Sequence, residues 1–224
     1  LTLRAQGADF SMNEFKFAMH YSGVKFHLGV HADEEVEDAQ EYLQRLKGDE
    51  WETMGTNEQS QIDLLAPYLL EDEAYEGGPK VGEDYRLVPY SGGGEMRPAL
   101  LNREVDCSWA VGTWVAEEDS LESVACVAPE RDPVLPDVPT LQEQGYPPLG
   151  PVVTARHALM FNPGVPDFVP RAWADAWAEV IDQDEVQEWS EESGNWLVNV
   201  GPQEMQDMVS EMEELIDEYA RVPQ

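Results

Sequence analysis

The residues best suited to binding chemistry are three consecutive glycines, Gly92–Gly94, in the stretch VPYSGGGEM. They follow an apolar, strand-like run and precede a helix-like one. Backbone N–H groups in such a strand-to-helix turn can surround an anion. No lysine follows the glycines, and neither GxxxxGKS/T nor GxGxxG is present, so a nucleotide site is not indicated. The alternative is a tight turn in which the glycines only supply positive φ angles.

A second strand-to-helix turn, GTNEQSQ at residues 55–61, carries hydroxyl and amide groups on Thr56, Asn57 and Ser60. The dipole of the following helix favours a small anion at this position. In a parallel sheet both turns would lie beyond the carboxyl ends of their strands, where ligands usually bind. The two turns together predict a small-anion site, and ordinary N-caps on two unrelated helices are the alternative.

Other catalytic patterns are sparse. His27 and His31 lack the glutamate of HExxH and lie in a strand pattern, which does not bring them together as a helix would. His20 and His157 have no evident partner, and neither GxSxG nor CxxC occurs. Carboxylates are so frequent that no acid–base pair stands out. We therefore predict no cofactor and no metal site.

Alternating strand and helix patterns position these turns. Strand patterns cover residues 24–31, 85–90, 105–111 and 121–128, and residues 51–61 are interpreted as a strand and turn. Helix patterns lie between them, the first capped by Asp33. This succession predicts an α/β layer fold with a largely parallel sheet. After Pro166 come two amphipathic helices, the strand NWLVNV and a final helix opened by Pro202, whose Trp and Met stripes we assign to the core.

The charge balance is strongly acidic. Among 224 residues, 46 are acidic and 13 basic, giving a formal net charge of −33. The acids are spread along the chain, so a disordered acidic tail does not explain them. Such a surface suits a halophilic protein, because molar salt screens repulsion beyond about 3 Å. It also excludes nucleic acid as a partner, since no basic stripe is present.

The cysteines and the length of the apolar runs predict free thiols and no membrane-spanning segment. Cys107 and Cys126 both lie in apolar strand patterns, so we expect buried free cysteines rather than a disulfide. No run of 18 apolar residues is present. There is no signal peptide or lipid-anchor cysteine at the start, and Leu1 is taken as an arbitrary beginning.

The segment RDPVLPDVPTLQEQGY, residues 131–146, carries a family resemblance. Together with VPYSGGGEMRPALLNREVDCSWA and MFNPGVP it resembles the extracytoplasmic solute receptors of tripartite tricarboxylate transporters. The order and spacing of these segments match that family from about residue 24 to about residue 222. The PDVPTLQEQG part is quite specific, and the other segments are weak when taken singly.

The resemblance implies a periplasmic-binding-protein-like two-lobe fold that closes on a small ligand, usually a carboxylate, and delivers it to membrane permease subunits. We expect an extracytoplasmic, monomeric solute-binding receptor and not an enzyme. Lobe 1 would consist of residues 1–29 and 157–224, and lobe 2 of residues 30–156. The hinge strands would lie near residues 24–31 and 152–161.

The resemblance also places ligand contacts on individual residues. Those near the two turns belong to the ligand loops, Ala110 would face the cleft after its strand, and His157 would lie on the second hinge strand. The set comprises Gly55, Thr56, Asn57, Ser60, Tyr90, Ser91, Gly92, Gly93, Gly94, Ala110 and His157.

This sequence departs from the family pattern at several points. Ser91 replaces a common lysine, His157 replaces a common aromatic residue, and the loop at residues 55–61 has fewer glycines. Family members also begin with a further segment of several dozen residues, so we expect an incomplete N-terminal lobe and an absent anchoring segment. Two alternatives stay open. One is an enzyme on a similar α/β scaffold that uses His157 and a carboxylate as acid and base. The other is a truncated, non-binding paralogue.

Overall fold

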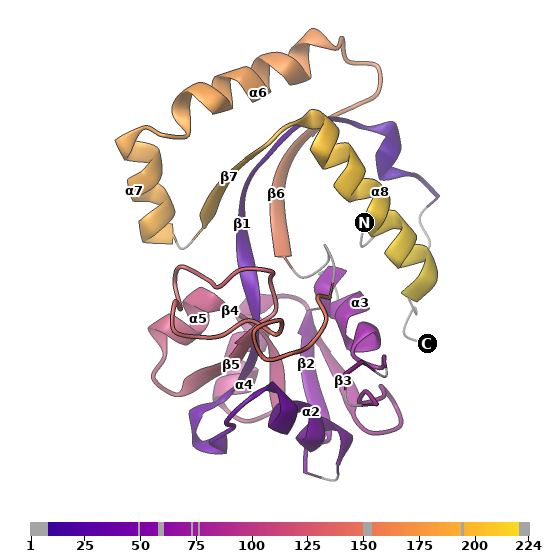
Figure 1. The fold of residues 1–224 in the computed structure, drawn as a ribbon, viewed down its shortest axis with the longest axis vertical. Helices are drawn as coiled ribbons and strands as arrows, with labels where there is room; N and C mark the ends of the chain where they lie inside the picture. Colours follow the sequence, from indigo (N-terminus) through magenta and orange to yellow (C-terminus); the bar gives the residue numbers. More distant parts are fainter. Residues whose placement is uncertain are drawn as a thin grey trace. The chain divides into compact units, whose positions relative to one another are not determined.

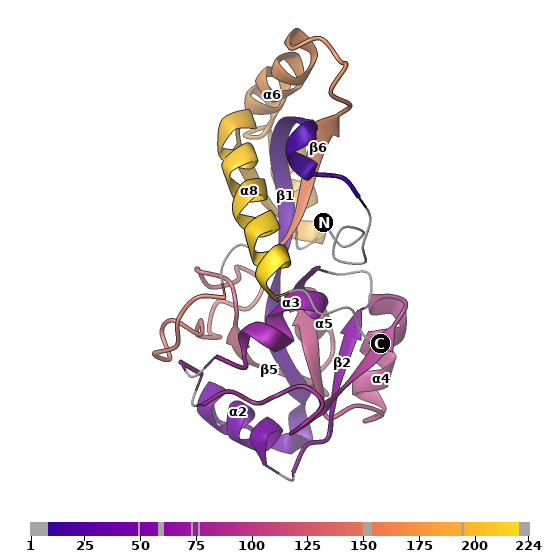
Figure 2. The same cartoon turned by 90° about the vertical axis from the view of Figure 1, so that its right-hand side faces the viewer.

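The structure, a computed structural model, describes residues 9–48, 50–57, 61–72, 74–75, 77–149, 154–193 and 195–219. It divides into two compact units (Figures 1 and 2). Among these residues, unit 1 comprises residues 9–24 and 154–218, and unit 2 comprises residues 25–149 together with residue 219. One long strand, β1 (Lys16–His31), contributes to both. The mixed strands and helices confirm the predicted α/β class.

Unit 2 is built on a sheet with the strand order β3-β2-β4-β1-β5. Its other strands are β2 (Thr53–Asn57), β3 (Arg86–Tyr90), β4 (Cys107–Val111) and β5 (Leu121–Cys126). β2 pairs in parallel with β3 and β4, whereas β1 pairs antiparallel with β4 and β5. The sheet is therefore mixed rather than largely parallel, because β1 runs against its neighbours.

The helices of unit 2 follow its strands, and they are α2 (Ala39–Lys47), α3 (Gln61–Leu69), α4 (Gly93–Leu101) and α5 (Gly112–Glu117). The N-cap of α2 is Asp38, whose carboxylate accepts the N–H of Glu41 at 2.9 Å, and not Asp33 as the sequence suggested. Asp33 lies in a 3-10 turn that ends at Glu35, where φ is +52° and a helix cannot continue. From Asp38 onward, α2 buries Tyr42, Leu43 and Leu46.

Unit 1 contains the first half of β1, paired with β6 (Thr154–Phe161) and antiparallel to β7 (Trp196–Val200). Its helices, α6 (Phe168–Val180), α7 (Asp184–Ser193) and α8 (Pro202–Tyr219), lie where the amphipathic patterns predicted them. Phe17 packs against Met205 and Val209 in a small core. The core assignment of the tryptophan stripe is wrong in part, because Trp173 and Trp189 remain 53% and 45% exposed.

A short 3-10 helix, Met12–Glu14, is tied to α8 by one buried carboxylate. Glu213 accepts hydrogen bonds from the Ser11 hydroxyl at 2.8 Å, the Met12 N–H at 2.5 Å and the Asn13 amide at 2.8 Å. Several neutral donors thus share one carboxylate, and such hydrogen bonds make burial of its charge tolerable.

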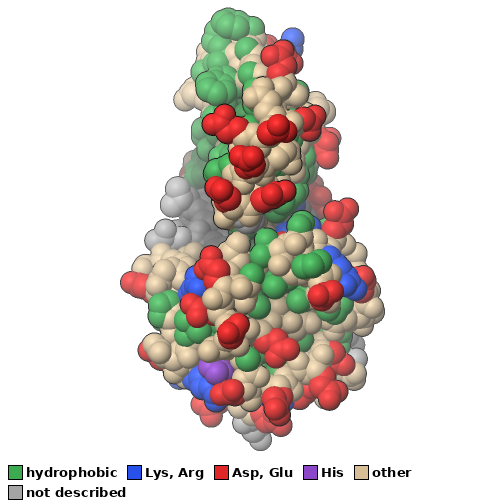
Figure 3. Space-filling view, turned by 90° about the vertical axis from the view of Figure 1, so that its left-hand side faces the viewer, with side chains coloured by type: hydrophobic (Ala, Val, Ile, Leu, Met, Phe, Trp, Pro, Cys, Tyr) green, Lys and Arg blue, Asp and Glu red, His purple; other side chains and the backbone are tan. Residues whose placement is uncertain are grey.

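The two cysteines are buried and free, as predicted. Burial raises the pKa of the Cys126 thiol to about 11, and the pKa of Cys107 is raised further for the same reason. Both thiols therefore stay protonated and unreactive at neutral pH. Acidic side chains lie scattered over the face drawn in Figure 3 rather than gathered in one patch.

Candidate ligand site

Three parallel strands of unit 2 end at one edge of its sheet. β2 ends at Asn57, β3 at Tyr90 and β4 at Val111, and the register aligns Asn57 with Tyr90. α4 and α5 begin within three residues of the ends of β3 and β4. The sequence predicted that the two turns lie beyond the carboxyl ends of parallel strands. The described parts of both turns have this placement. We call this region the carboxyl edge.

The three glycines at the carboxyl edge have different surroundings. None of Gly92, Gly93 and Gly94 has φ in the left-handed region; the Gly92 backbone is extended, with φ 169° and ψ 177°. A Cβ added at Gly93 would lie 2.5 Å from a ring carbon of Trp114, so Gly93 is required for packing. A Cβ at Gly92 or at Gly94 would meet nothing within 4 Å. The positive-φ explanation of these glycines is therefore wrong, and two of them border open space.

A protein carboxylate already reaches this turn. The N–H of Ser91 donates to Oε2 of Glu95, in the first turn of α4, at 3.2 Å. Hydrogen bonds from the Ser91 hydroxyl and N–H hold the pKa of Glu95 below its usual range. A negative charge near the start of α4 is stabilised by the helix dipole as well as by these donors. The turn can thus hold a carboxylate with no lysine.

The other residues predicted near the carboxyl edge are mostly buried. Gly55 packs against Met96 and Val105, and Thr56 is 4% exposed. Tyr90 is half-buried against the apolar cluster that also receives Trp114. Asn57 is half-buried at the strand end, and Ser60 lies outside the described residues.

Ala110 does not reach open space. It is fully buried in β4, and a Cβ built on Gly29 of β1 would come within 2.5 Å of the Ala110 methyl group. The side chain therefore packs inside the sheet. A direct contact between Ala110 and a ligand is not supported by this placement.

His157 lies on β6 in unit 1 and is exposed. Its Nδ1 is 2.9 Å from the hydroxyl of Ser22, and its ring centroid is 6.1 Å from that of Tyr21. These neighbours orient the imidazole but supply no carboxylate. Among the described residues, His157 therefore has no acid–base partner of the kind that the enzyme alternative requires.

The comparison with protein families decides the class of this protein. Residues 10–219 match the sequence profile of the tripartite tricarboxylate transporter family receptor, TctC. The chain belongs to this family. The matched range contains all the segments that carried the resemblance in the sequence. The family consists of solute receptors, so the enzyme alternative is not supported. The search among proteins of curated function found no match to this receptor.

Solved structures confirm the periplasmic-binding-protein fold of the receptor. A TctC solute-binding protein from Polaromonas, without ligand, has a TM-score of 0.72 and 16% identity over 96% of this chain and 74% of its own. MatC from Rhodopseudomonas palustris with bound malate has a TM-score of 0.72 and 19% identity over 96% and 75%. An R. palustris protein with adipate has a TM-score of 0.70 and 18% identity over 93% and 70%. The receptor is thus shorter than each of these chains.

Sequence reasoning missed a buried polar group in unit 2 of the receptor. His27 on β1 is fully buried, with Nδ1 2.8 Å from the Ser123 hydroxyl and Nε2 3.0 Å from Oδ2 of Asp132. The other carboxylate oxygen of Asp132 accepts the N–H of Val134 at 3.0 Å. A Cβ at Gly112 would lie 2.3 Å from Oδ2 of Asp132, so Gly112 packs closely against this group. The interactions fix the PDVPT-containing segment on β1.

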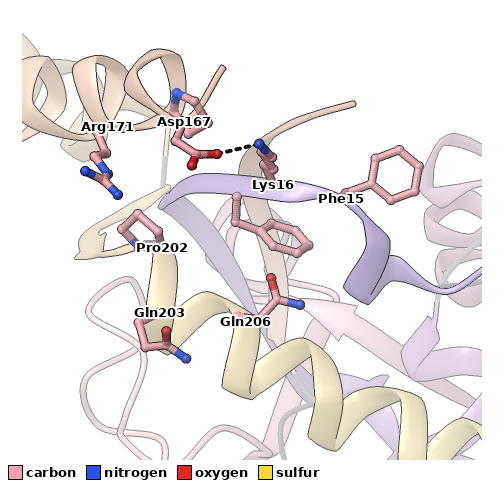
Figure 4. A pocket seen from close by; sticks show the side chains of 9 residues that line it. Phe15, Lys16, Asp167, Arg171, Pro202, Gln203 and Gln206 are labelled. Atoms are coloured by element: carbon pink, nitrogen blue, oxygen red, sulfur yellow. Dashed lines mark hydrogen bonds and ion pairs between the residues drawn. The ribbon is translucent and has the colours of Figure 1, made fainter. Parts of the chain in front are cut away.

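Two cavities of the receptor contain none of the predicted site residues. One, of about 260 Å³ in unit 1, lies among β1, α6 and α8 (Figure 4). There Lys16 forms an ion pair with Asp167 and donates to the carbonyl of Val165 at 2.8 Å. Its lining comprises Phe15, Lys16, Phe17, Asp167, Pro170, Arg171, Pro202, Gln203 and Gln206. The other, of about 330 Å³ in unit 2, is lined by Asp38, Gln40, Ala74, Gln144, Gly145 and Tyr146.

The described part of the receptor shows neither a metal site nor a membrane-spanning helix. There, no cluster of His, Cys, Asp and Glu side chains is arranged to hold a metal ion. None of the helices in the same residues combines the length and apolar character needed to cross a bilayer.

Proposed function

We propose that this receptor captures a small carboxylate at the carboxyl edge of unit 2 and delivers it to the permease of a tripartite tricarboxylate transporter. Family membership supports the receptor role. The malate and adipate bound by two similar structures support a carboxylate as the ligand. The receptor would act outside the cytoplasm, at the cell surface or in a periplasm.

The observation that carries the proposal is the turn at residues 91–94. Open space borders Gly92 and Gly94, and a carboxylate already accepts a hydrogen bond from the Ser91 N–H. Several aligned N–H and hydroxyl donors can share one negative charge, so the absence of lysine is no obstacle. Recognition by hydrogen bonds also suits molar salt, where the attraction between isolated charges is screened.

We further propose that units 1 and 2 are the two lobes of the receptor, with hinge strands near residues 24–31 and 152–161. Thr56, Asn57 and Ser60 would contribute to the ligand loop beside the glycine turn. His157 would contact the ligand from its place on β6. Gly55 and Tyr90 would support the loops through their packing, and Ala110 would act only through the sheet.

The test is calorimetric titration of the receptor at molar salt with succinate, malate, adipate and citrate, and with glucose as an uncharged control. We expect one of the acids to bind with a stoichiometry of about one, and the bound acid to be recovered unchanged. Binding of glucose in preference to every acid would contradict the carboxylate assignment, and chemical conversion of the bound acid would contradict the receptor role.

A further inference from the structure

The turn proposed to receive the ligand is partly occupied by the receptor itself. A backbone N–H can donate a strong hydrogen bond to one carboxylate at a time, and the N–H of Ser91 is directed to Glu95. A ligand carboxylate that used this donor would have to displace the Glu95 side chain or share the N–H with it. Glu95 is exposed, so its side chain has room to move away.

The negative charge of Glu95 is not neutralised nearby. Arg97, two residues further along α4, donates to Glu117 and Glu118 at 2.8 Å each. Within the ranges that the structure describes, no basic side chain forms an ion pair with Glu95. A ligand carboxylate entering beside Gly92 or Gly94 would therefore meet an uncompensated like charge, which is unfavourable at short range.

We propose that Glu95 is an internal competitor for the ligand carboxylate, holding the Ser91 donor in the unliganded receptor and releasing it when the ligand binds. This inference rests on the proposed function. Glu95 then lowers the affinity of every acid that uses this donor. An acid that contacts only this turn gains little by replacing one carboxylate with another, so an acid that binds tightly must make further contacts.

The perturbed ionisation of Glu95 is consistent with this role. Its pKa is lowered by the same two hydrogen bonds from Ser91, so the carboxylate remains charged at neutral pH. Displacement of the Glu95 side chain would break both hydrogen bonds, and hydrogen bonds from Ser91 to the ligand carboxylate would have to replace them. The competition is therefore present throughout the neutral pH range.

The experiment compares the wild-type receptor with Glu95→Gln and Glu95→Ala, titrated with acetate, succinate and malate at molar salt. The control is Glu122→Gln on β5, which removes an equal charge from an exposed position of unit 2. We expect Glu95→Gln to bind succinate and malate roughly three- to tenfold more tightly, the size of one net hydrogen bond. Glu95→Ala should bind at least as tightly, the control should be unchanged, and acetate should also gain affinity in both Glu95 variants, because the same displacement cost is removed for each acid.

The direction of the effect separates this role from a structural one. Loss of an acidic residue from the first turn of α4 weakens the helix, which would reduce binding rather than increase it. Unchanged or weaker binding by the Glu95 variants, with a wild type that binds, would overturn the competitor role and leave the proposed function intact. If neither wild type nor variants bind any acid, both are wrong. Binding only after Glu95 is replaced would support the competitor role.

Discussion

Replacement of Gly94 by alanine tests whether the glycine turn touches the ligand. Apart from its chain neighbours and the backbone of its own helix, a Cβ at this position meets no protein atom within 4 Å, so the methyl group projects into open space. Gly94 lies in the first turn of α4, where alanine stabilises a helix by about 0.5–1 kcal/mol relative to glycine. The free energy of unfolding should therefore rise slightly or stay constant.

Binding should respond in the opposite direction. A ligand carboxylate held by N–H groups of this turn would lose its close approach to the backbone. Each lost hydrogen bond to a charged group costs about 1.5–3 kcal/mol, which is roughly a ten- to hundredfold increase in Kd. The assay pairs calorimetric titration with malate and succinate with a thermal melt of the same preparation at the same salt.

Gly93→Ala is the contrasting variant. Its Cβ would lie 2.5 Å from Trp114, whereas unstrained carbon contacts are about 3.5–4.0 Å apart, so we expect overpacking to cost about 1–3 kcal/mol of stability. A bulkier Gly93→Val change would mix this damage with any effect on binding. If Gly94→Ala melts at or above the wild-type temperature and binds malate with unchanged Kd, the glycine turn does not hold the ligand.

Three further outcomes are expected. The melting temperature should rise between about 0.1 M and about 3 M KCl, because 46 acidic residues repel one another until salt screens them, and a constant value would count against the halophilic interpretation. Burial, and then the charge of Arg156, lower the pKa of His20 from 6.5 to about 4 in the folded state. Because the unfolded chain takes up this proton first, up to about 3 kcal/mol of the free energy of unfolding should be lost as the pH falls from 6.5 to 4. His20→Asn should flatten that part of the stability curve measured by denaturant unfolding. Glu213→Ala should lower the free energy of unfolding, measured with denaturant, by about 2–4 kcal/mol, because it removes the carboxylate shared by the donors of residues 11–13. An unchanged denaturation midpoint would show that this contact is dispensable.

The amphipathic elements were predictable because their signal is local. α6, α7 and α8 follow the 3.6-residue period, and the final helix begins at Pro202 as a proline at the first helical position indicates. The start of β1 was not predictable in the same way. The strand begins at Lys16, whereas the sequence predicted a start near Val24. Its first residues were missed because most of the strand is buried on both faces, and the alternation that marks a half-exposed strand is therefore absent.

The candidate site was predictable in position but not in detail. The strand-to-helix turns are visible in the sequence, and the parallel pairing of β2 with β3 and β4 brings their strands to one edge. The contact of Gly93 with Trp114 and the group formed by His27, Ser123 and Asp132 join residues far apart in the chain. No periodic pattern records such contacts. The exposed charge of Glu95 could be read as an ordinary first-turn acid, and only its bond to Ser91 distinguishes it.

The shared strand β1 has a consequence for how the chain acquires its structure during synthesis. Residues 25–31 find their partners in β4 and β5, which follow within about a hundred residues, whereas residues 16–24 pair with β6 and β7, which follow only after the whole of unit 2. Translation at about 5–20 residues per second leaves that first half without its partners for on the order of ten seconds. During that interval Phe17, Ala18 and Met19, buried in the finished protein, are exposed to solvent or to a chaperone. Residues 16–24 are thus made before β4 and β5 but secured after them, and their loop closure is entropically the most costly in the sheet.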